Sequence, residues 1–354
     1  MNPRRLLVPL AAVAATAIAA LTPAAGAQAA PIAQPGAATQ VREHDGIVVF
    51  SRFDAAEDAW RLAIRRPGQP AQDLPVAPSQ AEFQADIGPD SDGNPELIYR
   101  RSQGTGTSDL YVFSLTANVE RPVRNANDPS ADDTTPTLWR GRIAWTRVYH
   151  AGDPRRQSPV VYTKLLTAPR SRPSTRLPGV PQRRCGDVEI AQCGPTQSRY
   201  VGALELWGRN LAQTVGYACA GCSGVGQSEL RLVQTDTHRA QQVAFTIVGL
   251  SGQSFVGLAF QGGSLGWYRA CQGDPEGCKA GRRGPSRFAV ASGRYTEAVG
   301  DEVAVRGYAD AGTTLYEVLG CEVETQPELN RRCRIEELPA PSTFTSADPP
   351  LRDR

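Results

Sequence analysis

Lysine, methionine and histidine are scarce in this sequence. Lysine occurs only at Lys164 and Lys279, and the 354 residues include 1 Met and 3 His. Arginine therefore supplies nearly all of the positive charge, but it is scattered through every segment. This distribution indicates a compositional bias rather than a functional demand for guanidinium groups. The small number of histidines gives little support to nucleophilic catalysis, in which histidine often serves as the base.

The chain also lacks a surplus of charge of either sign. It has 38 Lys plus Arg against 36 Asp plus Glu, which gives a formal net charge of +2. Arg4 and Arg5 lie in an N-terminal segment that we expect to be removed, and without them the formal net charge is 0. A nucleic-acid-binding protein needs a basic surplus gathered against phosphate. We therefore expect no nucleic-acid partner.

Long apolar runs are confined to the N-terminus. Arg4 and Arg5 are followed by the apolar stretch Leu6–Leu21 and by Ala27-Gln28-Ala29, which is the pattern of a secretory signal peptide over residues 1–29. No later run approaches the roughly 20 apolar residues that span a bilayer. The sequence therefore predicts a secreted extracellular or periplasmic protein without membrane insertion.

Several catalytic motifs are absent as well. Dinucleotide and P-loop fingerprints do not occur, and the segments nearest to a G-x-S-x-G elbow, 221–225 and 252–256, lack its final glycine. The three histidines, His44, His150 and His238, are far apart in the sequence. We expect the protein not to be an enzyme and to need no cofactor.

A repeated pattern fills the rest of the chain. A short apolar segment, a turn built on Gly, Asp or Asn, and an apolar-aromatic segment recur, and 34 Gly and 28 Pro supply abundant turns. The aromatic anchors of the repeats are spaced by 49, 46, 72, 50 and 49 residues: Phe50, Tyr99, Trp145, Tyr217, Trp267 and Tyr316. Four short strands in a unit of about 45 to 50 residues are typical of a propeller blade.

The strand pattern PELIYRR…SDLYVFSL…ERPVR…DTTPTLWRGRIAWTRV, within residues 83–165, resembles the TolB-like β-propeller repeats, which are relatives of the WD-repeat class. The turn Pro89–Gly93 is similar to the Pro-Asp-Gly turn that leads into the innermost strand of the next blade in that family. The resemblance implies an all-β propeller of an exported bacterial protein, and it says little about function.

The number of repeats predicts a six-bladed β-propeller over residues 39–338, with the aromatic anchors on the innermost strands. The alternative is five blades plus a C-terminal hairpin. We expect the segment Thr39–Glu43 to close the ring by completing the sixth unit, because closure removes exposed sheet edges. Residues 30–38 are then a flexible linker, residues 339–354 are a disordered tail, and the protein is a monomer.

Eight cysteines fall into four consecutive close pairs: Cys185 with Cys193, Cys219 with Cys222, Cys271 with Cys278, and Cys321 with Cys333. An exported chain enters an oxidising compartment, so we expect four sequential disulfides on one face of the ring. The C-x-x-C spacing at Cys219 also suits a redox pair or half of a zinc site. We favour the disulfide, because neither a following helix nor a second ligand pair is present.

Arginine recurs two residues after four of the aromatic anchors, at Arg52, Arg101, Arg147 and Arg269. Equivalent positions in successive blades surround the ring axis, so these side chains are candidate ligands for a carboxylate, sulfate or phosphate group. The alternative is that each arginine pairs with a nearby acid or extends into solvent, and we favour this alternative.

Oxygen-bearing side chains alternate in the loop that follows Pro89. Asp90, Asp92 and Asn94 are candidate calcium ligands, although calcium takes about six to eight oxygen atoms. The alternative, which we favour, is an Asp/Gly/Asn turn whose side chains cap the local backbone.

The sequence thus predicts a secreted, non-catalytic propeller that serves as a binding scaffold for a protein or for an envelope component such as a polysaccharide. The alternative is a propeller enzyme of the polysaccharide lyase or glycosidase type, with facing carboxylates in the central channel. A ligand sensor that uses the four arginines is a third interpretation.

Overall fold

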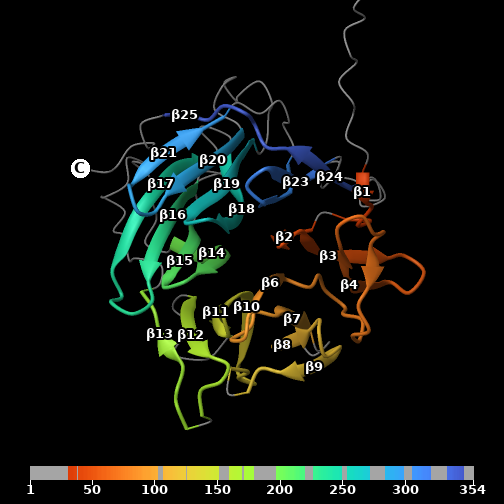
Figure 1. The fold of residues 1–354 in the computed structure, drawn as a ribbon. Helices are drawn as coiled ribbons and strands as arrows, with labels where there is room; N and C mark the ends of the chain where they lie inside the picture. The colour runs from red at the N-terminus through yellow and green to blue at the C-terminus, as the bar shows by residue number, and fades with distance from the viewer. Residues whose placement is uncertain are drawn as a thin grey trace, which may run out of the picture.

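The computed structural model describes residues 31–37, 39–102, 107–124, 126–150, 159–169, 171–178, 197–219, 226–248, 253–271, 284–298, 305–319 and 333–346. In this part of the chain every regular element is a β-strand, and six small antiparallel sheets are arranged in a ring (Figure 1). The fold is a six-bladed β-propeller, as the sequence predicts. No helix in the described ranges is long and apolar enough to cross a membrane.

The first three blades follow one another along the chain, and each begins with its innermost strand. Blade 1 contains β2 (Val41–His44), β3 (Ile47–Asp54), β4 (Ala59–Arg65) and β5 (Gln72–Asp73). Blade 2 contains β6 (Ala85–Pro89), β7 (Pro95–Ser102), β8 (Ser108–Ser114) and β9 (Val119–Pro122). Blade 3 contains β10 (Ala131–Trp139), β11 (Arg142–Tyr149), β12 (Val160–Leu165) and β13 (Thr175–Arg176).

Blades 4 and 5 continue the same order, and blade 6 takes its last strand from the N-terminus. Blade 4 contains β14 (Gln197–Trp207), β15 (Asn210–Cys219), β16 (Gly226–Gln234) and β17 (Ala240–Val248). Blade 5 contains β18 (Gln253–Gln261), β19 (Ser264–Cys271), β20 (Gly284–Ala289), β21 (Arg294–Glu297) and β25 (Thr345–Ser346). Blade 6 contains β22 (Gly307–Asp310), β23 (Thr314–Leu319), β24 (Arg334–Pro339) and β1 (Pro31–Ala33).

Blade 6 combines one strand from the N-terminal part of the chain with three from the C-terminal part, so the ring is closed, but not by the segment predicted to close it. Strand β1 pairs with β24, with Pro31 opposite Glu336 and Ala33 opposite Ile335. Residues 31–33, within the predicted linker, form this outermost strand. The predicted closing segment, Thr39–Glu43, instead leads into β2 at the ring axis.

The C-terminal segment predicted to be a disordered tail, 339–354, also contributes to a sheet. Thr345 and Ser346 pair with Glu297 and Thr296, so β25 covers the outer edge of blade 5. A strand of two residues carries almost no periodic signal. Its formation depends on an exposed edge that is provided by a distant part of the chain.

The aromatic anchors lie on the second strands, not on the innermost ones. Phe50, Tyr99, Trp145 and Trp267 are on β3, β7, β11 and β19, and all four are fully buried. A second strand has a neighbour on both sides within its sheet and a neighbouring blade on its faces, so it accommodates the largest side chains. The innermost strands contact one another around the axis, where less space is available.

Glycine permits this close approach at the axis. A Cβ atom at Gly88 of β6 would lie 2.3 Å from the carbonyl oxygen of Leu138 on β10. A Cβ atom at Gly257 of β18 would lie 2.2 Å from the carbonyl oxygen of Tyr308 on β22, and Gly257 also has a φ of +63°. A larger residue at either position would force neighbouring blades apart.

The hydrophobic core is divided among the spaces between blades. One cluster joins Leu110 of blade 2 to Leu138 and Trp145 of blade 3. Another joins Leu230 of blade 4 to Trp267 of blade 5. Burial of these faces against neighbouring sheets stabilises the ring, because no blade covers both of its own faces.

The cysteine-bearing segments all connect strand ends on one face of the ring. Three of them run from the second to the third strand of blades 4, 5 and 6, and the fourth runs from blade 3 to blade 4. In antiparallel blades these two kinds of connection emerge at the same end. Cys333 is fully buried. The four sequential pairs stay a prediction, because Cys185, Cys193, Cys222, Cys278 and Cys321 lie outside the described residues.

Candidate functional site

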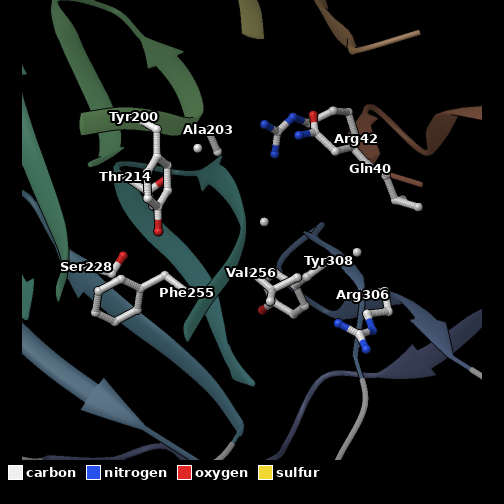
Figure 2. Close-up of a pocket in the computed structure, with 14 residues that line it drawn as sticks. Gln40, Arg42, Tyr200, Ala203, Thr214, Ser228, Phe255, Val256, Arg306 and Tyr308 are labelled. Atoms are coloured by element: carbon white, nitrogen blue, oxygen red, sulfur yellow. The ribbon is translucent and has the colours of Figure 1, made fainter. Parts of the chain in front are cut away.

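One guanidinium group crosses the ring axis. Arg42 lies on β2, and its side chain is only 5% exposed. Its Nη1 donates to the carbonyl oxygen of Leu258 on β18 at 2.7 Å, and its Nη2 donates to that of Leu204 on β14 at 3.2 Å. Figure 2 shows Arg42 extending from β2 toward the strand that carries Ala203. A single side chain from blade 1 therefore binds blades 4 and 5.

Two carboxylates lie beside this guanidinium. The Nε atom of Arg42 is 3.9 Å from Oδ1 of Asp86 on β6 and 3.7 Å from Oε2 of Glu205 on β14. The separation of the two carboxylate oxygens cannot exceed the sum of these distances. We call Arg42, Asp86 and Glu205 the axial cluster.

Asp86 is held by the neighbouring blade. Its Oδ2 accepts hydrogen bonds from the hydroxyl of Thr137 at 2.7 Å and from the backbone N–H of Leu138 at 2.8 Å, both on β10. The hydroxyl oxygen of Thr137 in turn accepts from the backbone N–H of Leu206 on β14 at 2.9 Å. These bonds connect blades 2, 3 and 4 at the axis. Burial raises the pKa of Asp86, although Arg42 and the hydrogen bonds act in the opposite direction.

Glu205 is less well satisfied. Its Oε2 atom and the Nε atom of Arg42 have no hydrogen-bond partner in the described part of the chain. Burial raises the pKa of Glu205 well above its usual range, and the charge of Asp86 raises it further, whereas Arg42 lowers it. Two acids thus share one guanidinium in a buried place, which favours the retention of a proton by the cluster.

A cavity of about 240 Å³ adjoins the axial cluster (Figure 2). It lies between the innermost strands of blades 1, 4, 5 and 6, and Arg42 contributes to its wall. Tyr200, Phe255 and Gly307 stand near the starts of β14, β18 and β22. The cavity is therefore toward the face on which the cysteine-bearing segments connect. We call it the axial cavity.

The axial cavity combines aromatic surfaces with cations. Tyr200 and Phe255 lie on one side and Arg306 on the other in Figure 2, with Tyr308 between them. Tyr200 is 48% exposed, and its ring lies against Gly216, where a Cβ atom would be 1.9 Å from the tyrosine Cζ. Arg306 forms no ion pair within the described ranges, and no carboxylate is among the residues that line the cavity. Such a wall suits a ligand with a flat or apolar face and an anionic group.

The four arginines predicted to line the axis lie one strand away from it. Arg52, Arg101, Arg147 and Arg269 are on β3, β7, β11 and β19, which are the second strands of their blades. They do not converge on a shared anion site, because the aromatic anchors that precede them lie on second strands and not on innermost ones.

Each of these arginines instead pairs with an acid of its own blade: Arg52 with Asp73, Arg101 with Glu120, Arg147 with Asp133, and Arg269 with Glu297. In blades 2 and 3 the guanidinium also lies over a third-strand ring, 3.9 Å from the centroid of Tyr111 and 5.3 Å from that of Tyr162. The repeated arginine therefore ties strands together within a blade.

The loop that carries the candidate calcium ligands forms the capped turn that we favour. Asp90 Oδ1 accepts hydrogen bonds from the backbone N–H groups of Asp92 and Asn94, both at 2.8 Å. The amide of Asn94 donates to Asp90 Oδ2 at 3.3 Å. These bonds to the turn lower the pKa of Asp90. Within the described ranges, no group of three or more His, Cys, Asp or Glu residues is placed to hold a metal ion.

Sequence reasoning missed all three members of the axial cluster. The available signal was a charged residue enclosed by apolar neighbours in a short strand: Arg42 beside Val41, Asp86 between Ala85 and Ile87, and Glu205 between Leu204 and Leu206. Such a residue must find a partner when its strand is buried.

No protein-family model and no curated protein matches the sequence. Solved structures do match the fold. TolB from Acinetobacter baumannii is 12% identical with a TM-score of 0.45, over 85% of this chain and 65% of that chain. An oligogalacturonate lyase from Vibrio parahaemolyticus is 8% identical with a TM-score of 0.48, over 89% and 94%. An α-L-arabinofuranosidase from Fusarium graminearum is 9% identical with a TM-score of 0.49, over 87% and 94%.

These similarities concern the propeller fold alone. The chain spans less than two thirds of the length of that TolB. The matching proteins include TolB, a lyase and a glycosidase, so a shared propeller does not select among their activities.

Proposed function

We propose that the protein is an exported, non-catalytic β-propeller that binds a ligand in the axial cavity. The observation that supports this proposal is the contrast between the axial cavity and the axial cluster. The cavity is lined by aromatic rings and by Arg306, which has no ion-pair partner in the described residues, whereas the two acids of the cluster lie against Arg42.

The chemistry of the wall supports a ligand class. Tyr200 and Phe255 offer ring faces, and Arg306 offers a guanidinium that binds carboxylate or phosphate oxygens. We therefore favour an anionic envelope component with a sugar ring or an aromatic face, or a protein side chain of the same kind. The predicted signal peptide would deliver the protein to such a ligand, and the predicted disulfides would reinforce the face nearest to the cavity.

The enzyme alternative draws on the proximity of Asp86 and Glu205. A glycosidase needs two carboxyl groups that face the substrate, one of them as a proton donor. Here both groups contact Arg42, and neither lines the cavity. This arrangement favours a structural role for the acids.

The test is capture of a component from the organism's own envelope extract by the full mature chain, followed by titration of that component. We expect Arg306→Ser and Tyr200→Ala to weaken binding by about tenfold or more, because each removes a contact in the cavity. Arg294→Ser, an exposed arginine on blade 5, serves as the matched control. Unchanged binding by both cavity variants would contradict the proposal.

The same captured component distinguishes binding from catalysis. We expect it to be recovered intact after prolonged incubation with the protein. Conversion to a product that is lost in Glu205→Gln would instead assign an enzyme.

A further inference from the structure

A second cavity lies on the outer part of the ring, between blades 2 and 3. Its volume is about 540 Å³, and it is lined by the β8–β9 region of blade 2 and by the turn after β12 in blade 3. A smaller cavity of about 60 Å³ adjoins it and shares Lys164 and Ala168 with it. We call the two together the rim groove. It is separate from the axial cavity and shares no residue with it.

Lys164 lies at the junction of the two cavities. It is one of only two lysines in the sequence, and it is 7% exposed. Its Nζ donates to the backbone carbonyl of Arg124 at 3.3 Å, and no carboxylate pairs with it in the described part of the chain. A largely buried lysine whose ammonium group has one carbonyl partner among the described residues is poorly compensated.

The groove gathers further cations and no acids. Besides Lys164, its lining includes Arg121, Arg124, Arg142 and Arg172, and it includes no Asp or Glu. Arg121 is bound to Glu96 at 2.6 Å, but the other three arginines form no ion pair with any described residue. The chain as a whole has nearly equal numbers of acids and bases. Four cations in one groove that have no ion-pair partner among the described residues are therefore not the consequence of a basic surface.

We propose that the rim groove binds a short oligoanion, that is, a ligand with several phosphate or carboxylate groups along its length. A volume of about 540 Å³ is within the range of small-ligand sites. Lys164 would meet one anionic group inside the groove, and Arg124 and Arg172, which are exposed, would meet the groups on either side. Burial lowers the pKa of Lys164, and a bound anion would reverse that effect.

The inference does not depend on the proposed function of the axial cavity. The test is calorimetric titration of the full mature chain with tripolyphosphate, with trigalacturonate and with neutral maltotriose. We expect at least one of the two anions to bind, with an affinity that falls as salt is added, and maltotriose not to bind. Binding of tripolyphosphate alone or trigalacturonate alone would identify the anionic group.

The decisive variant is Arg124→Ser combined with Arg172→Ser, because both side chains are exposed and their loss leaves the fold intact. We expect it to weaken anion binding by about tenfold or more. Lys164→Met keeps the unbranched side chain apart from its terminal ammonium group and removes the charge, and we expect a similar loss of affinity. Arg294→Ser is the matched control, with affinity unchanged within about twofold.

Three outcomes would overturn the inference. The first is that neither anion binds. The second is that the Arg124→Ser/Arg172→Ser variant binds the anion as tightly as the unaltered protein does. The third is that maltotriose binds as tightly as the anions do. In contrast, loss of binding in Arg306→Ser but not in the rim variant would place the anion in the axial cavity and would reject the rim groove.

Discussion

Arg42 and the four arginines of the second strands differ by one strand in position and by the kind of partner that they bind. Arg42 lies at the axis, and its partners come from blades 2, 4 and 5. Arg52, Arg101, Arg147 and Arg269 lie one strand farther out, and each pairs with an acid of its own blade. An arginine at the axis thus connects blades, whereas an arginine on a second strand stabilises a single blade.

The difference follows from packing. Around the axis the innermost strands contact one another, so a long side chain reaches the backbone of a blade that is distant in sequence. On a second strand, neighbouring blades are separated by the hydrophobic clusters, and the nearest acid is on a strand of the same sheet. The two positions therefore differ in burial and in the number of blades that lose a contact on substitution.

The largest expected effect is that of Arg42→Met. The variant loses two hydrogen bonds to backbone carbonyls and leaves Asp86 and Glu205 buried without their shared cation. We expect the free energy of unfolding to fall by about 3 to 5 kcal/mol, measured by urea denaturation. Arg294→Met, at an exposed site, should change it by less than about 0.5 kcal/mol. A loss below about 1 kcal/mol for Arg42→Met would remove the distinction between the two kinds of arginine.

Arg147→Met should have the next largest effect. Arg147 donates to Asp133 from Nε at 2.8 Å and from Nη2 at 3.0 Å, and the Asp133 side chain is fully buried. Without the guanidinium, Asp133 keeps only the bond from Trp145 Nε1 among its side-chain partners. We expect a loss of about 2 to 3 kcal/mol at neutral pH.

The cost of Arg147→Met should decrease on acidification. Burial raises the pKa of Asp133 to about 6, and loss of Arg147 would raise it further. Below that range the carboxyl group is protonated and no longer needs a cation. An equal loss of stability at pH 5 and pH 8 would contradict this account.

The repeat predicts six blades in preference to five, but it does not reveal which strand faces the axis. Phe50 and its equivalents mark the best-buried strand of each unit, and in a ring that strand is the second one. Arg42 and Glu205 stand 163 positions apart, and their contact exists only once the ring has closed. A single charged residue within a short apolar strand does not say which distant partner it will meet.

The two remaining discrepancies have the same origin. Strands β1 and β25 contain three and two residues, too few for a periodic pattern, and both form on edges offered by other blades. The capped turn at Asp90 was predictable, because Asp and Asn at alternate positions are typical of such turns.

The pH dependence of stability provides a smaller test of the axial cluster. The pKa of Glu205 is raised in the folded state, so the folded protein retains a proton that the unfolded chain releases above about 4.5, the ordinary value for Glu. Stability from this group is therefore present below that pH and is lost as the pH rises through the folded pKa. For one proton the slope is at most about 1.4 kcal/mol per pH unit.

The pKa values of other acids, such as Asp86 and Glu82, are also raised, so the slope of the unaltered protein does not report Glu205 alone. The variant Glu205→Gln removes the contribution of this one group. We expect the variant to show a flatter decline of the free energy of unfolding between pH 5 and pH 8 than the unaltered protein. Identical slopes in the two proteins would mean that Glu205 does not retain the proton.

The smallest expected effect is that of Arg52→Ser. The side chains of Arg52 and Asp73 are 37% and 31% exposed, so water screens their attraction and hydrates Asp73 when the arginine is removed. We expect a loss of no more than about 1 kcal/mol, which decreases further in high salt. Because Arg52 pairs within blade 1, binding in the axial cavity should be unchanged. A loss as large as that of Arg147→Met would show that the outer pair of blade 1 contributes as much as a buried one, and burial would then no longer explain the ranking of these arginines.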